Sequence, residues 1–77
     1  MKVIKFFEHE GFEYQIAHLE TQFAVQLWFK YPGDTRWELG HEKDIPLGEN
    51  ASYVAATMRA FIVGELDHDE YNRLLPS

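Results

Sequence analysis

The feature that most constrains the fold is the strict alternation of side chains between residues 23 and 31. Successive side chains of a strand point to opposite faces of its sheet, so a period of two residues indicates a strand with one buried face. Large apolar groups alternate here with small or polar ones, apart from one tryptophan on the second face. Phe23, Val25, Leu27, Phe29 and Tyr31 form the first face, and Ala24, Gln26, Trp28 and Lys30 form the second.

Pro32-Gly33-Asp34 follows this strand and has the chemistry of a turn. Proline fixes φ, glycine tolerates positive φ, and aspartate can bond to nearby backbone N–H groups. A three-residue loop would place Phe29 opposite Trp37 and Leu27 opposite Leu39, whereas a two-residue loop would place Phe29 opposite an arginine. We predict the three-residue loop, because both strands then send large apolar side chains to one face.

The segment 1–8 is rich in β-branched and aromatic residues and predicts a first strand, with residues 12–20 as its partner. A three-residue loop at 9–11, with its glycine in the left-handed conformation, turns Ile4 and Phe6 toward the core. A two-residue loop would instead set a lysine opposite an isoleucine and pair two glutamates, which costs burial and adds repulsion. The three-residue loop is therefore the prediction.

The second and third strands are joined near Thr21-Gln22, either by a tight turn or by a four-residue loop. Both connections pair Ile16 with Leu27, and Glu13 with Lys30. Four strands in sequence order then form an antiparallel meander. Its apolar face must be covered and is predicted to carry Ile4, Phe6, Phe12, Tyr14, Ile16, Val25, Leu27, Phe29, Trp37 and Leu39.

The cover is predicted to be helical and follows a polar linker at 42–48. Asn50 is a good N-cap, and Gly64 ends the helix that follows. Asp67 and Glu70 form a capping box for a short second helix that ends near Leu75-Pro76. The fold class is therefore α+β, a four-stranded antiparallel meander with two C-terminal helices packed on one face. The apolar positions of the first helix are Ala51, Val54, Ala55, Met58, Phe61 and Ile62.

Composition limits the classes of protein to consider. The 77 residues make a single domain, 1–77, and the 45% hydrophobic content is enough for a core. The absence of cysteine excludes disulfides and thiolate metal sites. The chain has no apolar run of about 18 residues, so we expect a cytoplasmic protein, in the host cell if a phage encodes it. A net charge of −6 repels phosphate and favours a protein partner with a basic surface over direct nucleic-acid or membrane binding.

Residues that could carry catalysis do not occur in catalytic patterns. The four histidines lack metal-ligand spacing, and His18 and His41 are expected to cap the core at one end of the sheet. The acidic residues 67–70 lack the glycine and the later glutamate of a calcium loop. No nucleophile elbow or phosphate loop is present. We therefore predict a protein that is not an enzyme, with no catalytic residues, cofactor or metal.

The uncovered face of the sheet is the most informative surface. Five apolar residues on an open face suggest a partner surface, with Trp28 as its anchor. The alternative is that the helices curl round the sheet or that the first strand faces the other way. The predicted apolar residues of this face are Val3, Phe7, Ala17, Leu19 and Trp28, ringed by Lys5, Glu13, Lys30, Arg36 and Glu38.

The opening residues Met1-Lys2-Val3-Ile4-Lys5-Phe6 resemble the start of a small phage anti-CRISPR protein that inhibits type I CRISPR systems. The predicted order of four strands and two helices is also similar. The resemblance implies a non-enzymatic inhibitor that binds the crRNA-guided surveillance complex and prevents it from engaging target DNA. Acidic members of such families act as DNA mimics, and the acidic excess of this chain fits that style.

The leading prediction is thus a small acidic inhibitor of phage origin whose carboxylates occupy a Lys/Arg surface. The alternative is a structural or assembly module that homodimerises, or binds a protein partner, through its open sheet face or a sheet edge. The predicted partner-binding residues are Glu8, Glu10, Glu13, Trp28, Glu38, Glu42, Asp44, Asp67, Asp69 and Glu70.

Overall fold

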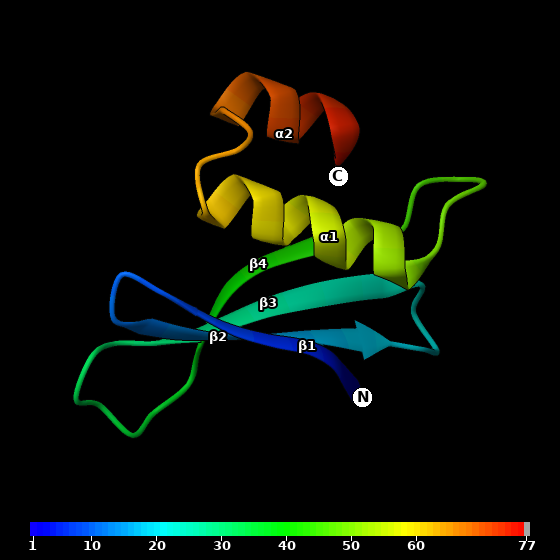
Figure 1. Ribbon diagram of the computed structural model, residues 1–77. Helices are drawn as coiled ribbons and strands as arrows, with labels where there is room; N and C mark the ends of the chain where they lie inside the picture. The colour runs from blue at the N-terminus through cyan, green and yellow to red at the C-terminus, as the bar shows by residue number, and fades with distance from the viewer. Residues whose placement is uncertain (77) are drawn as a thin grey trace.

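The computed structural model describes residues 1–76 and has the predicted α+β architecture. The strands pair antiparallel in the order β1-β2-β3-β4, and both helices lie on the same side of the sheet, with α1 next to it (Figure 1). The elements are β1 (Lys2–His9), β2 (Phe12–Leu19), β3 (Ala24–Lys30), β4 (Glu38–Asp44), α1 (Ala51–Ile62) and α2 (His68–Leu74).

The central pairing of β2 with β3 is the predicted one. Ile16 lies opposite Leu27, and Glu13 lies opposite Lys30. The connection is the four-residue alternative, because Leu19 pairs with Ala24 and the chain turns through the residues between them.

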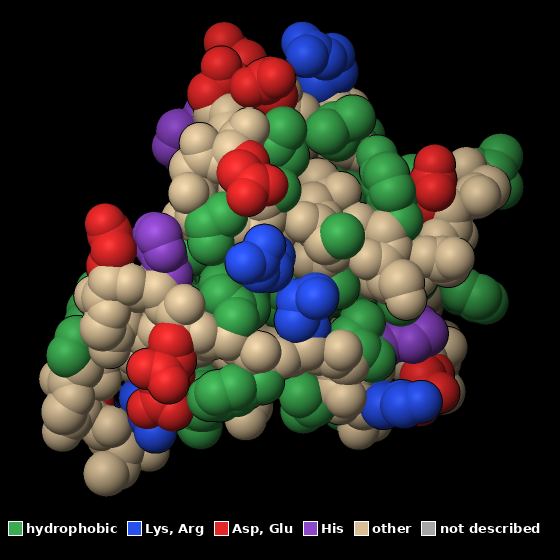
Figure 2. Space-filling model, viewed as in Figure 1, with side chains coloured by type: hydrophobic (Ala, Val, Ile, Leu, Met, Phe, Trp, Pro, Cys, Tyr) green, Lys and Arg blue, Asp and Glu red, His purple; other side chains and the backbone are tan. Residues whose placement is uncertain are grey.

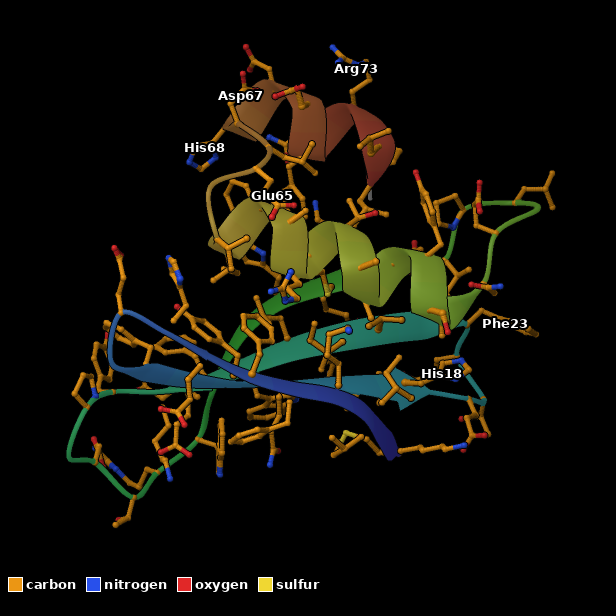
Figure 3. The ribbon with its side chains drawn as sticks, in the orientation of Figure 1. His18, Phe23, Glu65, Asp67, His68 and Arg73 are labelled. Carbon is orange, nitrogen blue, oxygen red and sulfur yellow. The ribbon has the colours of Figure 1, made fainter. Side chains whose placement is uncertain are left out.

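This connection contains a strained residue, Phe23, whose φ is 51°. Its side chain is 72% exposed and points away from the molecule in Figure 3. A left-handed φ costs an L-residue about 1–2 kcal/mol, and glycine escapes that cost. We therefore expect Phe23→Gly to raise the free energy of unfolding by about 0.5–1 kcal/mol in urea titrations.

Tyr31→Gly is the control for this prediction. Tyr31 is also an exposed aromatic residue, but its φ is not positive. Glycine at position 31 should destabilise the protein, because it adds freedom to the unfolded chain and removes the contacts of the Tyr31 ring with Phe12 and Phe29, with no left-handed φ to relieve. Equal losses in both variants would mean that Phe23 is not strained.

The predicted pairing of β1 with β2 is wrong by one residue from Lys5 to His9, whereas Lys2 and Val3 keep the predicted register. The turn is the two-residue alternative, with Glu10 at φ 52° and Gly11 at φ 85°, as a type I′ hairpin requires. Lys5 therefore lies opposite Ile16, and Phe7 takes the core-facing position predicted for Phe6. The repulsion expected for the adjacent Glu8 and Glu13 is offset by a 3.1 Å ion pair between Glu13 and Lys30.

Ile4 nevertheless faces the helices, as predicted. The register of β1 against β2 shifts between Val3 and Lys5, and Ile4 is the additional residue. A bulge of this kind leaves one residue of the strand unpaired and changes the direction of the side chains beyond it. Ile4 and Phe7 both pack against the core cluster, while Phe6 is exposed on the other face.

The predicted pairing of β3 with β4 is also wrong. Phe29 lies opposite Glu38, and Trp28 lies opposite Leu39, so Leu39 is on the open face of the sheet rather than in the core. The loop is longer than predicted because the Asp34 carboxylate accepts hydrogen bonds from the backbone N–H groups of Thr35 and Arg36. These residues form a local turn and do not extend the hairpin.

A second irregularity in β4 occurs at Gly40. The register shifts between Leu27, which lies opposite His41, and Trp28, which lies opposite Leu39. A Cβ at position 40 would be 3.2 Å from Phe29 Cδ1 and 3.3 Å from the Leu27 carbonyl oxygen, so a larger residue here would crowd the Phe29 ring and the β3 backbone.

The core lies between the sheet and the helices. The caps of both helices are those predicted: Asn50 accepts a hydrogen bond from Tyr53 N–H, and Asp67 and Glu70 form the reciprocal capping box. Gly64 follows α1 with φ 87°. The buried cluster consists of Ile16, Val25, Leu27, Val54, Ala55, Met58, Tyr71 and Leu75.

Candidate functional site

The sheet has one face covered by the helices and one face that we call the open face. The pairings place the side chains of Val3, Phe6, Ala17, Trp28 and Leu39 on the open face. Val3, Phe6 and Leu39 are each about half exposed. This face is thus more apolar than is usual for a sheet face in contact with solvent.

A hollow of about 220 Å³ lies at the centre of the open face. Trp28 of β3 and Trp37, which directly precedes β4, both border it, and the small, buried Ala17 is also part of the lining. The volume is below the range of about 300–1,000 Å³ that is usual for small-molecule sites. The residues lining the hollow are Met1, Val3, Gln15, Ala17, Trp28 and Trp37.

Polar contacts fix the orientation of both tryptophans. Trp28 Nε1 donates a 3.0 Å hydrogen bond to Gln26 Oε1, and Gln26 Nε2 donates a 2.6 Å bond to Glu42 Oε1. The Lys30 ammonium lies 5.1 Å from the ring centroid of Trp37, whose ring also packs edge-on against Phe6. Both rings are therefore held in place before any partner binds, which lowers the entropy cost of binding.

The strands give the open face an acidic character. Among the paired strand residues, four carboxylates lie on it, those of Glu8, Glu13, Glu42 and Asp44, against one side-chain ammonium group, that of Lys30. Lys30 is already paired with Glu13. The remaining charge attracts a partner with basic side chains.

The structure divides the predicted partner-binding residues into separate groups. Glu8, Glu13, Trp28, Glu42 and Asp44 share the open face. The other predicted residues lie elsewhere: Glu10 in the β1–β2 turn, Glu38 opposite Phe29 on the other face, and Asp67, Asp69 and Glu70 at the start of α2.

Figure 2 shows acidic side chains gathered over α2, separate from those at the two ends of the sheet. Asp67 projects from the start of α2, away from the sheet, in Figure 3. One flat partner surface could not contact the acidic residues of α2 and those of the open face at once, because the sheet and α1 lie between them.

Sequence reasoning missed Phe6, Trp37 and Leu39 as members of the open face and wrongly included Phe7. All of these errors follow from the registers of the two outer strands. The positive φ required by a Glu-Gly turn, and the glycine within β4, are the sequence signals that could have indicated the observed pairings.

A second concave region lies between β4, the end of α1 and α2. His41 and His18 occupy core-facing positions opposite Leu27 and Val25, as predicted. His41 Nδ1 is 3.0 Å from the Tyr71 hydroxyl, a hydrogen bond between residues 30 apart in the chain. This contact was missed because no local pattern links positions so distant.

Burial favours the uncharged forms of both His41 and Tyr71. It raises the pKa of Tyr71 to about 12. Burial also lowers the pKa of His41, and the nearby charges of Lys43 and His68 lower it further. At neutral pH the hydrogen bond therefore joins an uncharged phenol to an uncharged imidazole.

The described part of the chain contains neither a metal-ligand cluster nor a helix that could span a membrane. Residues 1–76 contain no group of three or more His, Cys, Asp or Glu side chains that could hold a metal ion. None of the helices among these residues is long and apolar enough to cross a membrane.

Comparison with known protein families identifies the family of this chain. The family model described as "Mycobacterium phage L5 gene 74 protein" matches residues 5–77, which is nearly the whole chain. Neither the curated proteins nor the solved structures gave a match. The chain therefore belongs to the Mycobacterium phage L5 gene 74 protein family, a family of phage proteins.

Proposed function

We propose that this phage protein is a small non-enzymatic inhibitor that binds the basic surface of a protein partner through its open face. The observation that carries the proposal is the central hollow, in which Trp28 and Trp37 are fixed beside a surplus of carboxylates. Aromatic anchors in a central hollow with a polar rim are typical of protein-binding surfaces.

The size of the hollow supports a protein partner. At about 220 Å³ it is small for a separate ligand but suits an apolar side chain that projects from a partner surface. The carboxylates of Glu8, Glu42 and Asp44 surround the apolar centre and would pair with Lys or Arg side chains beside that projecting group.

The partner we propose is a type I crRNA-guided surveillance complex. The phage family and the resemblance of the first six residues to an anti-CRISPR protein both favour it. A Lys/Arg surface that receives DNA phosphates matches the charge of the open face, so binding there would block target DNA. Mimicry of DNA would then involve the carboxylates of the open face and not those of α2.

Binding of the purified surveillance complex tests this proposal. Trp28→Ala should weaken binding by about 30-fold or more, because truncation of an anchor costs 2 kcal/mol or more. Leu47→Ala is the control, since Leu47 is fully exposed on a loop outside the open face. Equal affinities of the two variants would contradict the role of the open face.

Charge variants separate the two acidic groups. Glu42→Gln combined with Glu8→Gln should weaken binding and reduce its dependence on salt, whereas Asp69→Asn on α2 should change neither. The opposite result would assign the interaction to α2. A stable homodimer in sedimentation that is lost in Trp28→Ala would favour the alternative, an assembly module that uses the open face for self-association.

A further inference from the structure

The second concave region, which we call the β4–α2 pocket, has the size of a ligand site. Its volume is about 320 Å³, within the range usual for small-molecule sites. It lies on the helical side of the sheet, and Glu42 of the edge strand β4 is the one residue that it shares with the open face. The pocket is lined by Gly40, His41, Glu42, Lys43, Phe61, His68, Tyr71 and Asn72.

One wall of the pocket is aromatic. The rings of Phe61 and Tyr71 stack with centroids 4.2 Å apart and an interplanar angle of 10°. His68 packs edge-on against Phe61 at 4.9 Å, and His41 lies 5.5 Å from Tyr71. Tyr71 is buried in this stack, whereas Phe61 is only partly buried, so Phe61 is the aromatic surface that an apolar group in the pocket can contact.

The rest of the lining contains several hydrogen-bond donors, of which Lys43 carries a positive charge. The Lys43 ammonium lies 5.1 Å from the Tyr71 ring centroid and, among residues 1–76, forms no ion pair with a carboxylate. His68 and Asn72 are four residues apart in α2 and thus share one face of that helix. They add a ring N–H and an amide NH₂ donor.

Negative charge is scarce in the same lining. Glu42 is its one acidic residue, and its carboxylate accepts a hydrogen bond from Gln26 on the open face. Lys43 and His68 are close enough to His41 to lower its pKa. The pocket therefore concentrates cationic and neutral donors in a protein whose net charge is −6.

We infer that the β4–α2 pocket binds a small organic anion, a phosphate or carboxylate joined to a planar apolar group. The anionic oxygens contact Lys43, His68 and Asn72, and the planar group lies against the aromatic wall at Phe61. An ammonium group and neutral donors that converge beside an apolar surface are the features that recognise such a ligand.

The test is an NMR titration of the full chain with phenyl phosphate, benzoate, inorganic phosphate and benzyl alcohol. Phenyl phosphate or benzoate should saturate and shift the signals of His68, Asn72 and Gly40, with a Kd below about 1 mM. Whichever of these two binds more tightly identifies the anionic group. Inorganic phosphate and benzyl alcohol each lack one half of the ligand and should bind at least about tenfold more weakly.

Lys43→Gln should weaken binding of the tighter probe by about tenfold, while Lys30→Gln on the open face leaves it unchanged. Preserved dispersion of the amide spectrum would show that Lys43→Gln is folded. Absence of saturable binding by both aromatic anions would overturn the inference, and so would equal affinities of the two lysine variants.

Discussion

Leu27→Ala should lower the free energy of unfolding by about 3–5 kcal/mol, whereas Leu39→Ala should lower it by less than about 1 kcal/mol. Both residues are leucines on adjacent strands, but Leu27 is 2% exposed in the core cluster and Leu39 is 48% exposed on the open face. Truncation of Leu27 removes buried apolar area and leaves a cavity under α1, and truncation of Leu39 leaves no cavity.

Urea denaturation of the two variants measures this difference. Stability of about 5–15 kcal/mol is usual for small domains, so the loss at Leu27 is a large fraction of the total. If the two truncations cost the same, the assignment of the two faces of the sheet would be wrong. The partner surface proposed around Trp28 would then lie in the core.

Leu75→Ala should cost about 2–4 kcal/mol, while Leu74→Ala should cost less than about 1 kcal/mol. These neighbours are a matched pair at the end of α2, since Leu75 is 0% exposed and Leu74 is 38% exposed. A helix as short as α2 does not form alone in water, so its stability depends on packing against α1 and the sheet. Leu75 and Tyr71 provide that packing.

Hydrogen exchange provides a second measurement for this pair. In Leu75→Ala the amides of α2 should lose protection before those of β2 and β3, because α2 can then detach while the sheet stays folded. Detachment would break the hydrogen bond between His41 and Tyr71. Uniform loss of protection across the chain would instead mean that α2 unfolds only with the whole domain. Equal costs at positions 74 and 75 would contradict the packing of α2.

The parts of the fold that depend on local patterns could be predicted from the sequence. The alternation around Leu27 fixed the central pairing with Ile16, and the caps at Asn50 and Asp67 gave the starts of both helices. Each of these signals lies within a few residues of the feature it determines.

The outer strands could not be predicted in the same way, because one residue in a turn changes the facing of a whole strand. Glu10 adopts a left-handed conformation that is unusual for glutamate, and this shortens the first turn by one residue. The additional residues in β1 and β4 then change the facing again within each strand. A prediction that assumes regular alternation of the two faces along a strand does not include such shifts.

The errors in the registers of the outer strands also explain which residues of the open face were not predicted. Trp28 was identified as an anchor because it lies on the central strand, whose register was predicted correctly. Trp37, Phe6 and Leu39 join it only in the observed registers of the outer strands. The β4–α2 pocket depends on contacts such as that of His41 with Tyr71, which only the tertiary structure brings together.

The open face is the proposed binding surface, and its two tryptophans allow a direct test of that role. They are the only tryptophans in the chain and both border the hollow, so 19F NMR of protein labelled with fluorotryptophan reports on this surface alone. In the free protein, a soluble paramagnetic agent should broaden both signals. On addition of unlabelled type I surveillance complex, both signals should shift and become protected from that agent. A complex that forms without changing either signal would contradict the assignment of the open face, and failure to form a complex at micromolar concentrations would contradict the proposed partner.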